Sequence, residues 1–340
     1  MPGIPKIAVT IGDAAGIGPE VVLKAVLDRS LLAECLPVIV GDSAVLKRTA
    51  EVCGLDCSLQ SVASEEELLT IGKGPVLFDL ANIGDEFTFG VESAKCGKAA
   101  GEFIEKSVAL WKGGFIDAIS TAPLSKRSLA LGGYSFPGHT EFLAALTGTE
   151  RFAMSFFAGD LRVLLMSTHL PLRDAIEKVT TESLLDLIRF ADEQISKLIG
   201  RKARIAVSGL NPHASENGMF GEEEASRMNP AIEMARAEQI EVSGPHSADT
   251  VFLRGFKGEF DAVIACYHDQ ATIAVKCLSF GAGVNVTLGL PLIRTSVDHG
   301  TAFDIAGKNI AEADSMKTAI KLAAKLATMN QQKARDGQLS

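Results

Sequence analysis

Short apolar segments alternate with longer amphipathic segments along almost the whole chain. Near-continuous apolar runs at Ile7–Ile11 and Pro37–Gly41 are typical of strands that helices cover on both faces. Between these runs, Pro19–Asp28 repeats apolar side chains at helical spacing. This alternation predicts an α/β protein with mostly parallel sheets and some antiparallel strands.

The same alternation continues through the middle of the chain, where two strands are joined by a short turn around Gly159 and are expected to form a hairpin. The final segment, residues 331–340, is polar and is expected to fray. The predicted strands are Val76–Asp79, Asp117–Thr121, Phe152–Phe157, Leu161–Ser167, Arg204–Gly209 and Asp261–Tyr267, and the predicted long helices are Ser93–Lys112 and Glu182–Ile199.

Three histidines, His169, His213 and His268, each stand just past the end of a predicted strand. Open α/β sheets bind ligands beyond the carboxyl ends of their strands, where distant segments converge. Three neutral imidazoles meeting there would form a metal site with open coordination positions, as a catalytic ion requires. Any one of them alone is more readily explained as a loop or core histidine with its ring nitrogens satisfied locally. Three at equivalent positions favour the metal site.

Length, composition and net charge indicate the number of domains and the kinds of partner to expect. The chain has 340 residues, of which 47% are hydrophobic and 22% charged, so two domains with sizeable cores are expected. Its formal net charge is -9, and no cluster of lysine and arginine is interleaved with aromatic residues. A nucleic-acid partner is therefore not expected, whereas a small anionic substrate remains compatible with local cations.

The beginning of the chain lacks the features of a signal peptide, and no apolar stretch approaches the roughly 20 residues of a membrane span. A cytoplasmic protein with no membrane partner is expected. The six cysteines lack the doubled C-x-x-C spacing of a zinc finger. Cys53 and Cys57 are close enough in sequence to touch a metal, but buried, reduced thiols are the preferred interpretation.

Two glycine-rich segments carry candidate chemistry. Residues 12–20 join a strand to a helix that begins at a proline, either to aim backbone amides at an anion or simply to make a tight turn. Their spacing is not that of the dinucleotide motif G-x-G-x-x-G. Residues 297–308 form a loop with more polar and glycine residues than a plain connector needs.

These two segments resemble the first turn and the adenosine-binding loop of the β-decarboxylating dehydrogenases that act on isopropylmalate and isocitrate. The chain as a whole resembles the 4-hydroxythreonine-4-phosphate dehydrogenase family. The resemblance rests on these two segments, on the three histidines, and on further motifs at residues 137–142, 211–216, 268–270, 283–291 and 294–300. The resemblance extends from roughly Lys6 to Met329. In the first turn, Ala14 replaces a proline that relatives commonly carry, which should reduce rigidity without removing function.

The resemblance implies two α/β/α domains with mostly parallel sheets, like those of isocitrate and isopropylmalate dehydrogenases, with the active site in the interdomain cleft. It implies a discontinuous domain of residues 1–125 plus 270–340 with the cofactor loop, and a domain of residues 126–269 with the metal ligands and dimer contacts. It also implies a homodimer whose subunits share the site.

The implied activity is a metal-dependent, NAD-linked oxidation of 4-phosphooxy-L-threonine at C3, followed by decarboxylation to 3-amino-2-oxopropyl phosphate in pyridoxal phosphate biosynthesis. The alternative within the family is a catabolic dehydrogenase of 4-phospho-D-threonate or 4-phospho-D-erythronate. The segment Pro137–Thr140 argues against the terephthalate dihydrodiol branch, whose substrate has no phosphate. Alternatives of other classes are a phosphate acyltransferase of related architecture and a ligand-binding protein without turnover.

The resemblance also implies residue roles, and the residue types suit them. The substrate-binding residues are His139, Thr140, Lys276, Asn285 and Arg294, with the first two at the phosphate, although Thr140 is alternatively an ordinary helix cap. The metal ligands are His169, His213 and His268, with zinc as the preferred ion and cobalt, nickel or magnesium as alternatives.

The remaining roles concern catalysis and the cofactor. Asp249 and Lys276 are the catalytic candidates, although Asp249 is at least as well explained as an exposed helix-capping residue. NAD is expected to contact the cofactor loop. The loop residues are Gly300, Thr301, Ala302 and Asp304. Because a carboxylate accepts from the ribose 2′-hydroxyl and repels a 2′-phosphate, Asp304 favours NAD over NADP.

Overall fold

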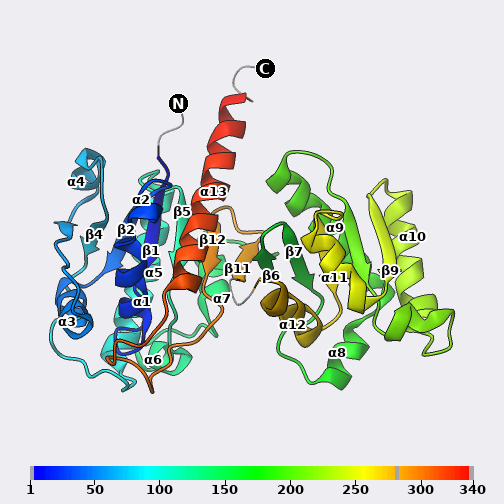
Figure 1. Cartoon of the computed structure of the whole chain (residues 1–340), viewed down its shortest axis with the longest axis horizontal. Coiled ribbons are helices and arrows are strands. Elements are labelled where there is room, and N and C mark those ends of the chain that lie inside the picture. The colour runs from blue at the N-terminus through cyan, green and yellow to red at the C-terminus, as the bar shows by residue number, and fades with distance from the viewer. Residues whose placement is uncertain (1–3, 280–282, 337–340) are drawn as a thin grey trace. The chain divides into compact units, whose positions relative to one another are not determined.

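The computed structural model describes residues 4–279 and 283–336, and their contacts divide the chain into two compact units (Figure 1). Unit 1 consists of the residues up to Phe152 together with those from Gly289 onward, and unit 2 is Ala153–Leu288. The sequence placed the boundaries near residues 125 and 270. The structure places them later because α7 (His139–Thr147) packs on α5 (Ala94–Lys112), and β11 (Val284–Leu288) pairs with β6 (Ala153–Ala158).

Unit 1 contains a fully parallel run of strands in the order β3-β4-β2-β1-β5-β12. The strands are β1 (Lys6–Thr10), β2 (Leu36–Gly41), β3 (Gln60–Val62), β4 (Val76–Asp79), β5 (Ala118–Thr121) and β12 (Ile293–Ser296). The other helices are α1 (Gly18–Val26), α2 (Arg29–Leu32), α3 (Ser43–Cys53), α4 (Glu65–Thr70), α6 (Lys126–Leu131) and α13 (Asp314–Asp336). β1, β2 and β5 are buried along their whole length except Lys6. The near-continuous apolar sequences of β1 and β2 predicted this burial.

Unit 2 contains the order β11-β6-β7-β10-β8-β9, in which β11, β6 and β7 are antiparallel and the remaining neighbours are parallel. The predicted hairpin is confirmed as β6 and β7, with Ser155 opposite Leu164. The other strands are β7 (Leu161–Leu165), β8 (Ile205–Ser208), β9 (Val242–His246) and β10 (Ala262–Ala265). The helices are α8 (Leu172–Lys178), α9 (Thr181–Ile199), α10 (Asn229–Ala237), α11 (Ala248–Phe256) and α12 (His268–Leu278), with short turns η1 (Pro212–Glu216) and η2 (Glu224–Met228).

The predicted mostly parallel α/β fold is therefore confirmed. The prediction of a frayed end from Gln331 is wrong for residues 331–336, because α13 continues to Asp336 and Gln331 donates from Nε2 to Oδ1 of Asp117 at 2.9 Å. The residues from 337 onward lie outside the described part of the chain.

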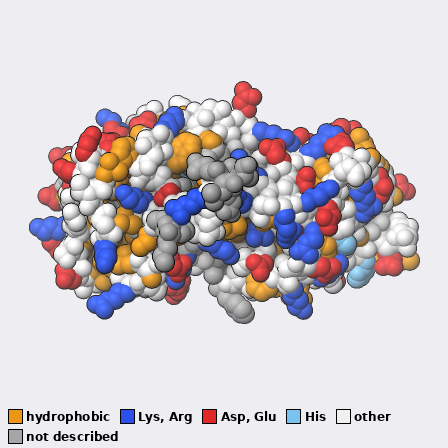
Figure 2. Space-filling view, turned by 90° about the horizontal axis from the view of Figure 1, so that it is seen from above, with side chains coloured by type: hydrophobic (Ala, Val, Ile, Leu, Met, Phe, Trp, Pro, Cys, Tyr) orange, Lys and Arg blue, Asp and Glu red, His pale blue; other side chains and the backbone are white. Residues whose placement is uncertain are grey.

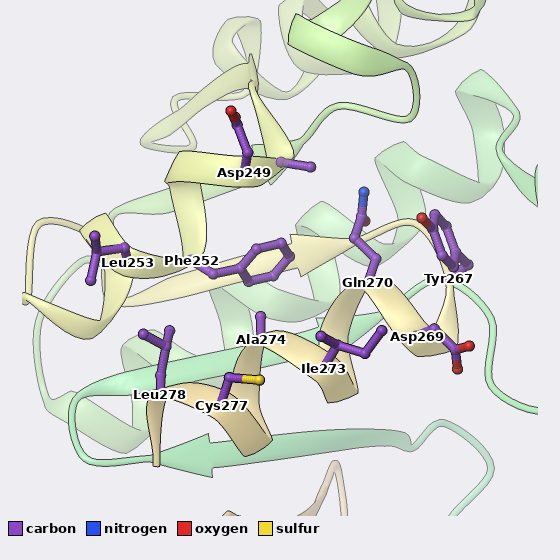
Figure 3. A pocket seen from close by; sticks show the side chains of 11 residues that line it. Asp249, Phe252, Leu253, Tyr267, Asp269, Gln270, Ile273, Ala274, Cys277 and Leu278 are labelled. Carbon is purple, nitrogen blue, oxygen red and sulfur yellow. The ribbon is translucent and has the colours of Figure 1, made fainter. Parts of the chain in front are cut away.

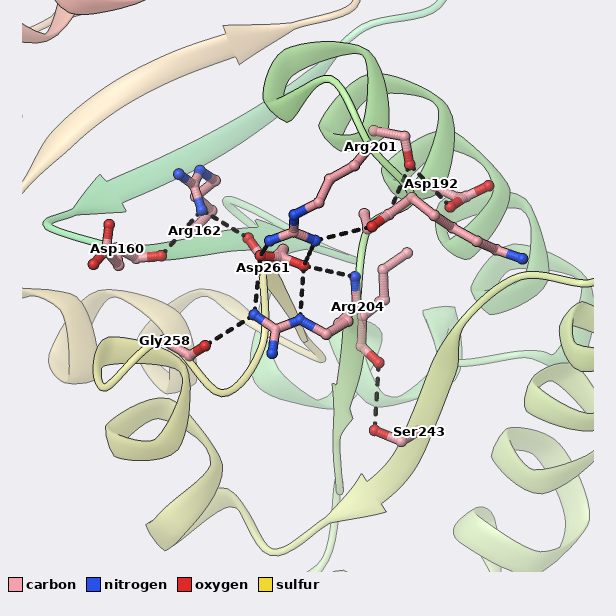
Figure 4. A network of polar contacts seen from close by, with 12 residues as sticks. Asp160, Arg162, Asp192, Arg201, Arg204, Ser243, Gly258 and Asp261 are labelled. Atoms are coloured by element: carbon pink, nitrogen blue, oxygen red, sulfur yellow. Dashed lines mark hydrogen bonds and ion pairs between the residues drawn. The ribbon is translucent and has the colours of Figure 1, made fainter.

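A network of hydrogen bonds and ion pairs surrounds Asp261 in unit 2 (Figure 4). Asp261, just before β10, accepts two hydrogen bonds from each of the Arg201 and Arg204 guanidinium groups, at 2.7–3.2 Å. It also accepts from the backbone N–H of Arg204 at 2.9 Å. Burial alone would raise the pKa of Asp261, but these hydrogen bonds outweigh burial and hold the pKa well below its usual range.

The surface mixes acidic and basic side chains over the face drawn in Figure 2. Within residues 4–279 and 283–336, no helix combines the length and the apolar character that a membrane span requires. All six cysteines are free thiols, and four of them are buried. The prediction of a buried thiol is confirmed for Cys53, whereas Cys57 is only partly buried.

Candidate functional site

Two of the predicted metal ligands lie side by side in unit 2. β7 and β10 are parallel neighbours, so His169 and His268, which follow these strands, emerge at the same edge. Their ring centroids are 5.5 Å apart. Nδ1 of His268 lies 2.7 Å from Oδ1 of Asp269. Because a carboxylate only accepts, Nδ1 is the donor and Nε2 keeps the lone pair that a metal would need.

His213 follows β8, the next strand beyond β10, but its ring lies against Phe220, with centroids 6.3 Å apart. Across the described residues, no three His, Cys, Asp or Glu side chains are grouped closely enough to hold a metal ion. The donor chemistry of His169 and His268 fits a transition metal, but one chain does not bring His213 to them. The three-histidine site therefore stays a prediction.

The turn that carries His213 has an unusual backbone. His213, Ala214, Ser215, Glu216 and Asn217 have φ values of 52°, 51°, 67°, 45° and 57°. This left-handed conformation costs a residue with a β-carbon roughly 1–2 kcal/mol. Five such residues in succession persist only if the surroundings impose them, and strained backbone of this kind is concentrated at functional sites.

A candidate anion site lies in unit 1 at the start of α7. Gly138 caps this helix without a side-chain hydrogen bond, so the first amides of α7 have no side-chain acceptor. His139 is half-buried as a residue, but its Nε2 is inaccessible and has no hydrogen-bond partner among the described residues. Burial, and secondarily the nearby Arg294 cation, hold the pKa of His139 well below its usual range. A neutral imidazole and helix-start amides suit a phosphate ester.

Arg294 adds a buried cation to the same part of unit 1. It lies on β12 beside β5, is 3% exposed, and donates from Nη2 to Oγ1 of Thr121 at 2.9 Å. Burial lowers the pKa of Arg294 to about 10, so the guanidinium stays charged at neutral pH. A buried cation held by the strand edge is suited to a charged ligand group.

Lys126 is a cation near the anion site that the sequence did not single out. A β-carbon on Gly138 would lie 3.9 Å from Cε of Lys126 and 3.4 Å from Oε2 of Glu141. Lys126 is exposed and has no hydrogen bond or ion pair within the described part of the chain. Its place at the start of α6, just after β5, was the available signal.

The other two predicted substrate contacts lie in unit 2. Lys276 is exposed on α12. Asn285 lies on β11, and its buried Oδ1 has no hydrogen-bond partner among the described residues. A buried amide oxygen without a donor is uncommon, and a water molecule or a ligand group could supply the missing donor.

Asp249 lies beside a pocket of about 510 Å³ between α11 and α12 (Figure 3). Its Oδ1 accepts from Oγ of Ser247 at 2.6 Å, and it does not cap α11, whose cap residue is Ser247. The pocket has an apolar floor that includes Phe252 and Ile273, and it carries the carboxylates of Asp249 and Asp269 but no cation. This lining does not suit a phosphate.

The cofactor loop between β12 and α13 packs on the glycine-rich turn after β1. Ile17 donates its backbone N–H to the carbonyl of Thr301 at 2.9 Å, and a β-carbon on Gly16 would lie 2.9 Å from that oxygen. Asp304 is exposed, with no hydrogen bond or ion pair within the described residues. Its carboxylate therefore does not brace its own loop and is accessible to a ribose.

The glycine-rich turn itself is closed by internal contacts. The backbone N–H groups of Asp13, Ala15, Gly16 and Ile17 all donate to protein oxygens. Gly12 has a φ of 68°, and a β-carbon there would lie 2.1 Å from the carbonyl oxygen of Pro123. The tight-turn interpretation therefore describes residues 12–17 better than the anion-binding one.

The comparisons with known proteins agree with these features. Residues 33–323 match the family described as "Pyridoxal phosphate biosynthetic protein PdxA". The chain is 45% identical, over 96% of its length and 98% of the relative's, to a D-threonate 4-phosphate dehydrogenase of Cupriavidus necator. It is also similar to two solved 4-hydroxythreonine-4-phosphate dehydrogenases, from Burkholderia phymatum (43% identity, TM-score 0.83, covering 96% and 99% of the two chains) and Klebsiella pneumoniae (39%, 0.88, 95% and 98%). The chain belongs to the PdxA family of dehydrogenases.

Proposed function

We propose that this protein oxidises a 4-phosphorylated 3-hydroxy acid with NAD at C3, that a divalent metal is required, and that the 3-keto product loses carbon dioxide. The observation that carries the proposal is the anion site of unit 1, where His139 and the amides at the start of α7 lie near the buried Arg294. A phosphorylated acid supplies the two anionic groups that such a site and the neighbouring cations would bind.

Within the family we infer that 4-phospho-D-threonate is the substrate, because a curated relative with 45% identity over 96% of the chain carries that activity in its name. 4-Phosphooxy-L-threonine is the second candidate, favoured by the names of the two solved structures. The two substrates differ at C2, where one has a hydroxyl and the other an ammonium group.

Each group of residues has a definite task in this proposal. Thr140 and His139 bind the phosphate, and Arg294 and Lys276 supply positive charge for the substrate anions. The buried Oδ1 of Asn285 accepts a hydrogen bond from the substrate. Asp304 accepts from the adenosine ribose of NAD. Asp249 is the candidate for receiving a proton.

His169 and His268 would hold the metal together with His213, and a second copy of the chain is expected to complete the set, since one chain groups only two of the three. When bound, the divalent cation would favour loss of the hydroxyl proton and stabilise the charge that develops during decarboxylation. Imidazole ligands favour zinc, cobalt or nickel over magnesium.

NADH formation measured by absorbance tests the proposal, with both phosphorylated substrates and 4-phospho-D-erythronate, in untreated, chelator-treated and metal-reconstituted protein. We expect turnover of 4-phospho-D-threonate, its loss on chelation and its recovery with zinc or cobalt. Preference for 4-phosphooxy-L-threonine would reverse the substrate assignment and would release an aminoketone instead of a hydroxyketone. Activity that survives complete metal removal would contradict the metal requirement.

A further inference from the structure

The segment that leads into the left-handed turn of His213 is bound by one buried carboxylate, that of Glu224. Glu224 is 3% exposed and lies in the π-helical turn η2. Its Oε1 accepts the backbone N–H groups of Leu210 at 2.9 Å and Asn211 at 2.7 Å. Its Oε2 accepts from Nδ2 of Asn211 at 2.9 Å. Glu224 thus binds two of the three residues that connect β8 to the turn.

The charge of this carboxylate is balanced by amides rather than by a cation. No lysine, arginine or histidine of the described residues forms an ion pair with Glu224. A buried carboxylate that accepts several N–H groups forms charge-assisted hydrogen bonds, which are shorter and stronger than neutral ones. A π-helical turn is uncommon and is found frequently at functional sites. Here it directs Glu224 toward Leu210 and Asn211.

A second contact confines the same turn. A β-carbon on Gly209 would lie 2.9 Å from Cα of Ala214, so the turn is pressed against the end of β8. The carbonyl of Gly209 accepts from Nε2 of Gln270 at 2.8 Å, and Oε1 of Gln270 accepts from the N–H of Cys266 at 2.7 Å. The end of β8 is therefore tied to the end of β10, two residues before His268.

From these contacts we propose that Glu224 is a positioning residue that imposes the left-handed conformation on residues 213–217 and thereby sets the direction of the His213 imidazole. The inference rests on the proposed function, in which His213 is a metal ligand. The reason is geometric. With φ near −60° the chain would leave β8 in another direction, and the imidazole would point elsewhere. The hydrogen bonds to Glu224 offset the steric penalty of the left-handed residues.

The test compares Glu224→Gln with Glu222→Gln, which removes an exposed carboxylate from the same segment. Two quantities are measured: hydrogen exchange of residues 210–217 in metal-free protein, and Co²⁺ affinity by titration of the folded protein. We expect Glu224→Gln to speed exchange and to weaken Co²⁺ binding by about 10- to 100-fold, the effect usual for partners of metal ligands. Glu222→Gln should change neither quantity.

A rescue separates positioning from general stability. Ala214→Gly should restore part of the Co²⁺ affinity in the Glu224→Gln background, because glycine adopts positive φ without a steric penalty. If Glu224→Gln does not fold, Asn211→Ala replaces it, since it removes the side-chain donor to Glu224 and Glu223 but keeps the two backbone donors to Glu224. Reduced Co²⁺ affinity of folded Asn211→Ala would then support the inference, and wild-type affinity would overturn it.

The outcomes also separate this inference from the proposed function. Faster exchange with unchanged Co²⁺ affinity would make Glu224 a purely structural residue and overturn the inference while the proposed function stands. Equal affinity and equal exchange in Glu224→Gln and wild type would overturn it as well. Wild-type protein that binds no Co²⁺ would overturn the inference and the metal requirement together.

Discussion

The guanidinium group of Arg294 donates to the hydroxyl group of Thr121 at 2.9 Å, although the two residues are 173 positions apart in the sequence. Both are almost completely buried, on the adjacent parallel strands β12 and β5. The hydroxyl holds one side of the guanidinium in place. This geometry makes Arg294 the best-defined candidate cation for the proposed substrate binding.

Arg294→Ala should raise KM for the phosphorylated substrate about 10- to 100-fold, because charge-assisted hydrogen bonds contribute about 1.5–3 kcal/mol. Arg294→Lys should recover only part of this loss, since lysine cannot donate in a fork. KM for NAD should be unchanged in both variants. Arg254→Ala, which removes a surface arginine paired with Glu259, is the control. Normal KM values combined with a much lower melting temperature would make Arg294 a structural residue.

The neutral His139 makes folding stability depend on pH. The pKa of this imidazole is well below its usual value in the folded protein, whereas the unfolded chain takes up a proton near pH 6.5. The unfolded state therefore binds more protons below that pH, and stability decreases as the pH falls. When the pH is lowered from 6.5 to 5.5, the free energy of unfolding measured in urea should fall by about 1 kcal/mol more in wild type than in His139→Gln. Identical losses would mean that His139 titrates normally.

The proposed metal binding is expected to depend on the three predicted histidines. His169→Ala, His213→Ala and His268→Ala should each sharply lower the metal content after dialysis, because three ligands leave no spare. His246→Ala is the matched control in the same unit, since Nε2 of His246 lies 2.9 Å from Oγ of Ser243 and no metal role is predicted for it. Atomic absorption on the dialysed proteins decides the point. Full metal retention by any one of the three variants would remove that histidine from the ligand set.

Asp304 is expected to control the choice between NAD and NADP. Asp304→Asn should weaken NAD binding and reduce the discrimination against NADP, since the repelling charge is lost while the fold is kept. The measurement is the ratio of kcat/KM for the two cofactors. Glu312→Gln, an exposed carboxylate near the same loop, should leave the ratio unchanged. A constant ratio in Asp304→Asn would mean that another residue recognises the ribose.

Asp261 stabilises unit 2 through the network of Figure 4. Its side chain is 7% exposed, whereas those of Arg201 and Arg204 are 54% and 40% exposed. Asp261→Asn should therefore destabilise the protein by about 2–3 kcal/mol at pH 7, below the ~3–5 kcal/mol typical when both partners are buried.

The pH dependence of that loss has a definite sign. The folded-state pKa of Asp261 is depressed, so its stabilisation is present above about pH 3.9 and disappears as the pH falls toward the lower folded-state pKa. The difference in the free energy of unfolding between wild type and Asp261→Asn, measured in urea, should thus be smaller at pH 3 than at pH 7. An equal difference at both pH values would show that packing, rather than charge, is lost.

The sequence by itself determined the class of fold and most of the candidate chemistry. Apolar runs such as Pro37–Gly41 are typical of strands that are covered on both faces, because such strands have no positions facing water. The hairpin of β6 and β7 followed from its short glycine turn. The position of the three histidines after strands predicted a shared edge, and parallel pairing of β7 with β10 placed two of them together.

Only the tertiary structure decided the environments of these residues. Whether His139 is neutral depends on burial and on Arg294, which lies 155 positions away. The boundaries of the units depended on which helices pack together. The left-handed turn at His213 could not be predicted from the sequence either, because residues 213–217 include no glycine and the local preference of these residues opposes positive φ. It exists because Glu224, 11 residues later in the chain, supplies hydrogen bonds that no local pattern encodes.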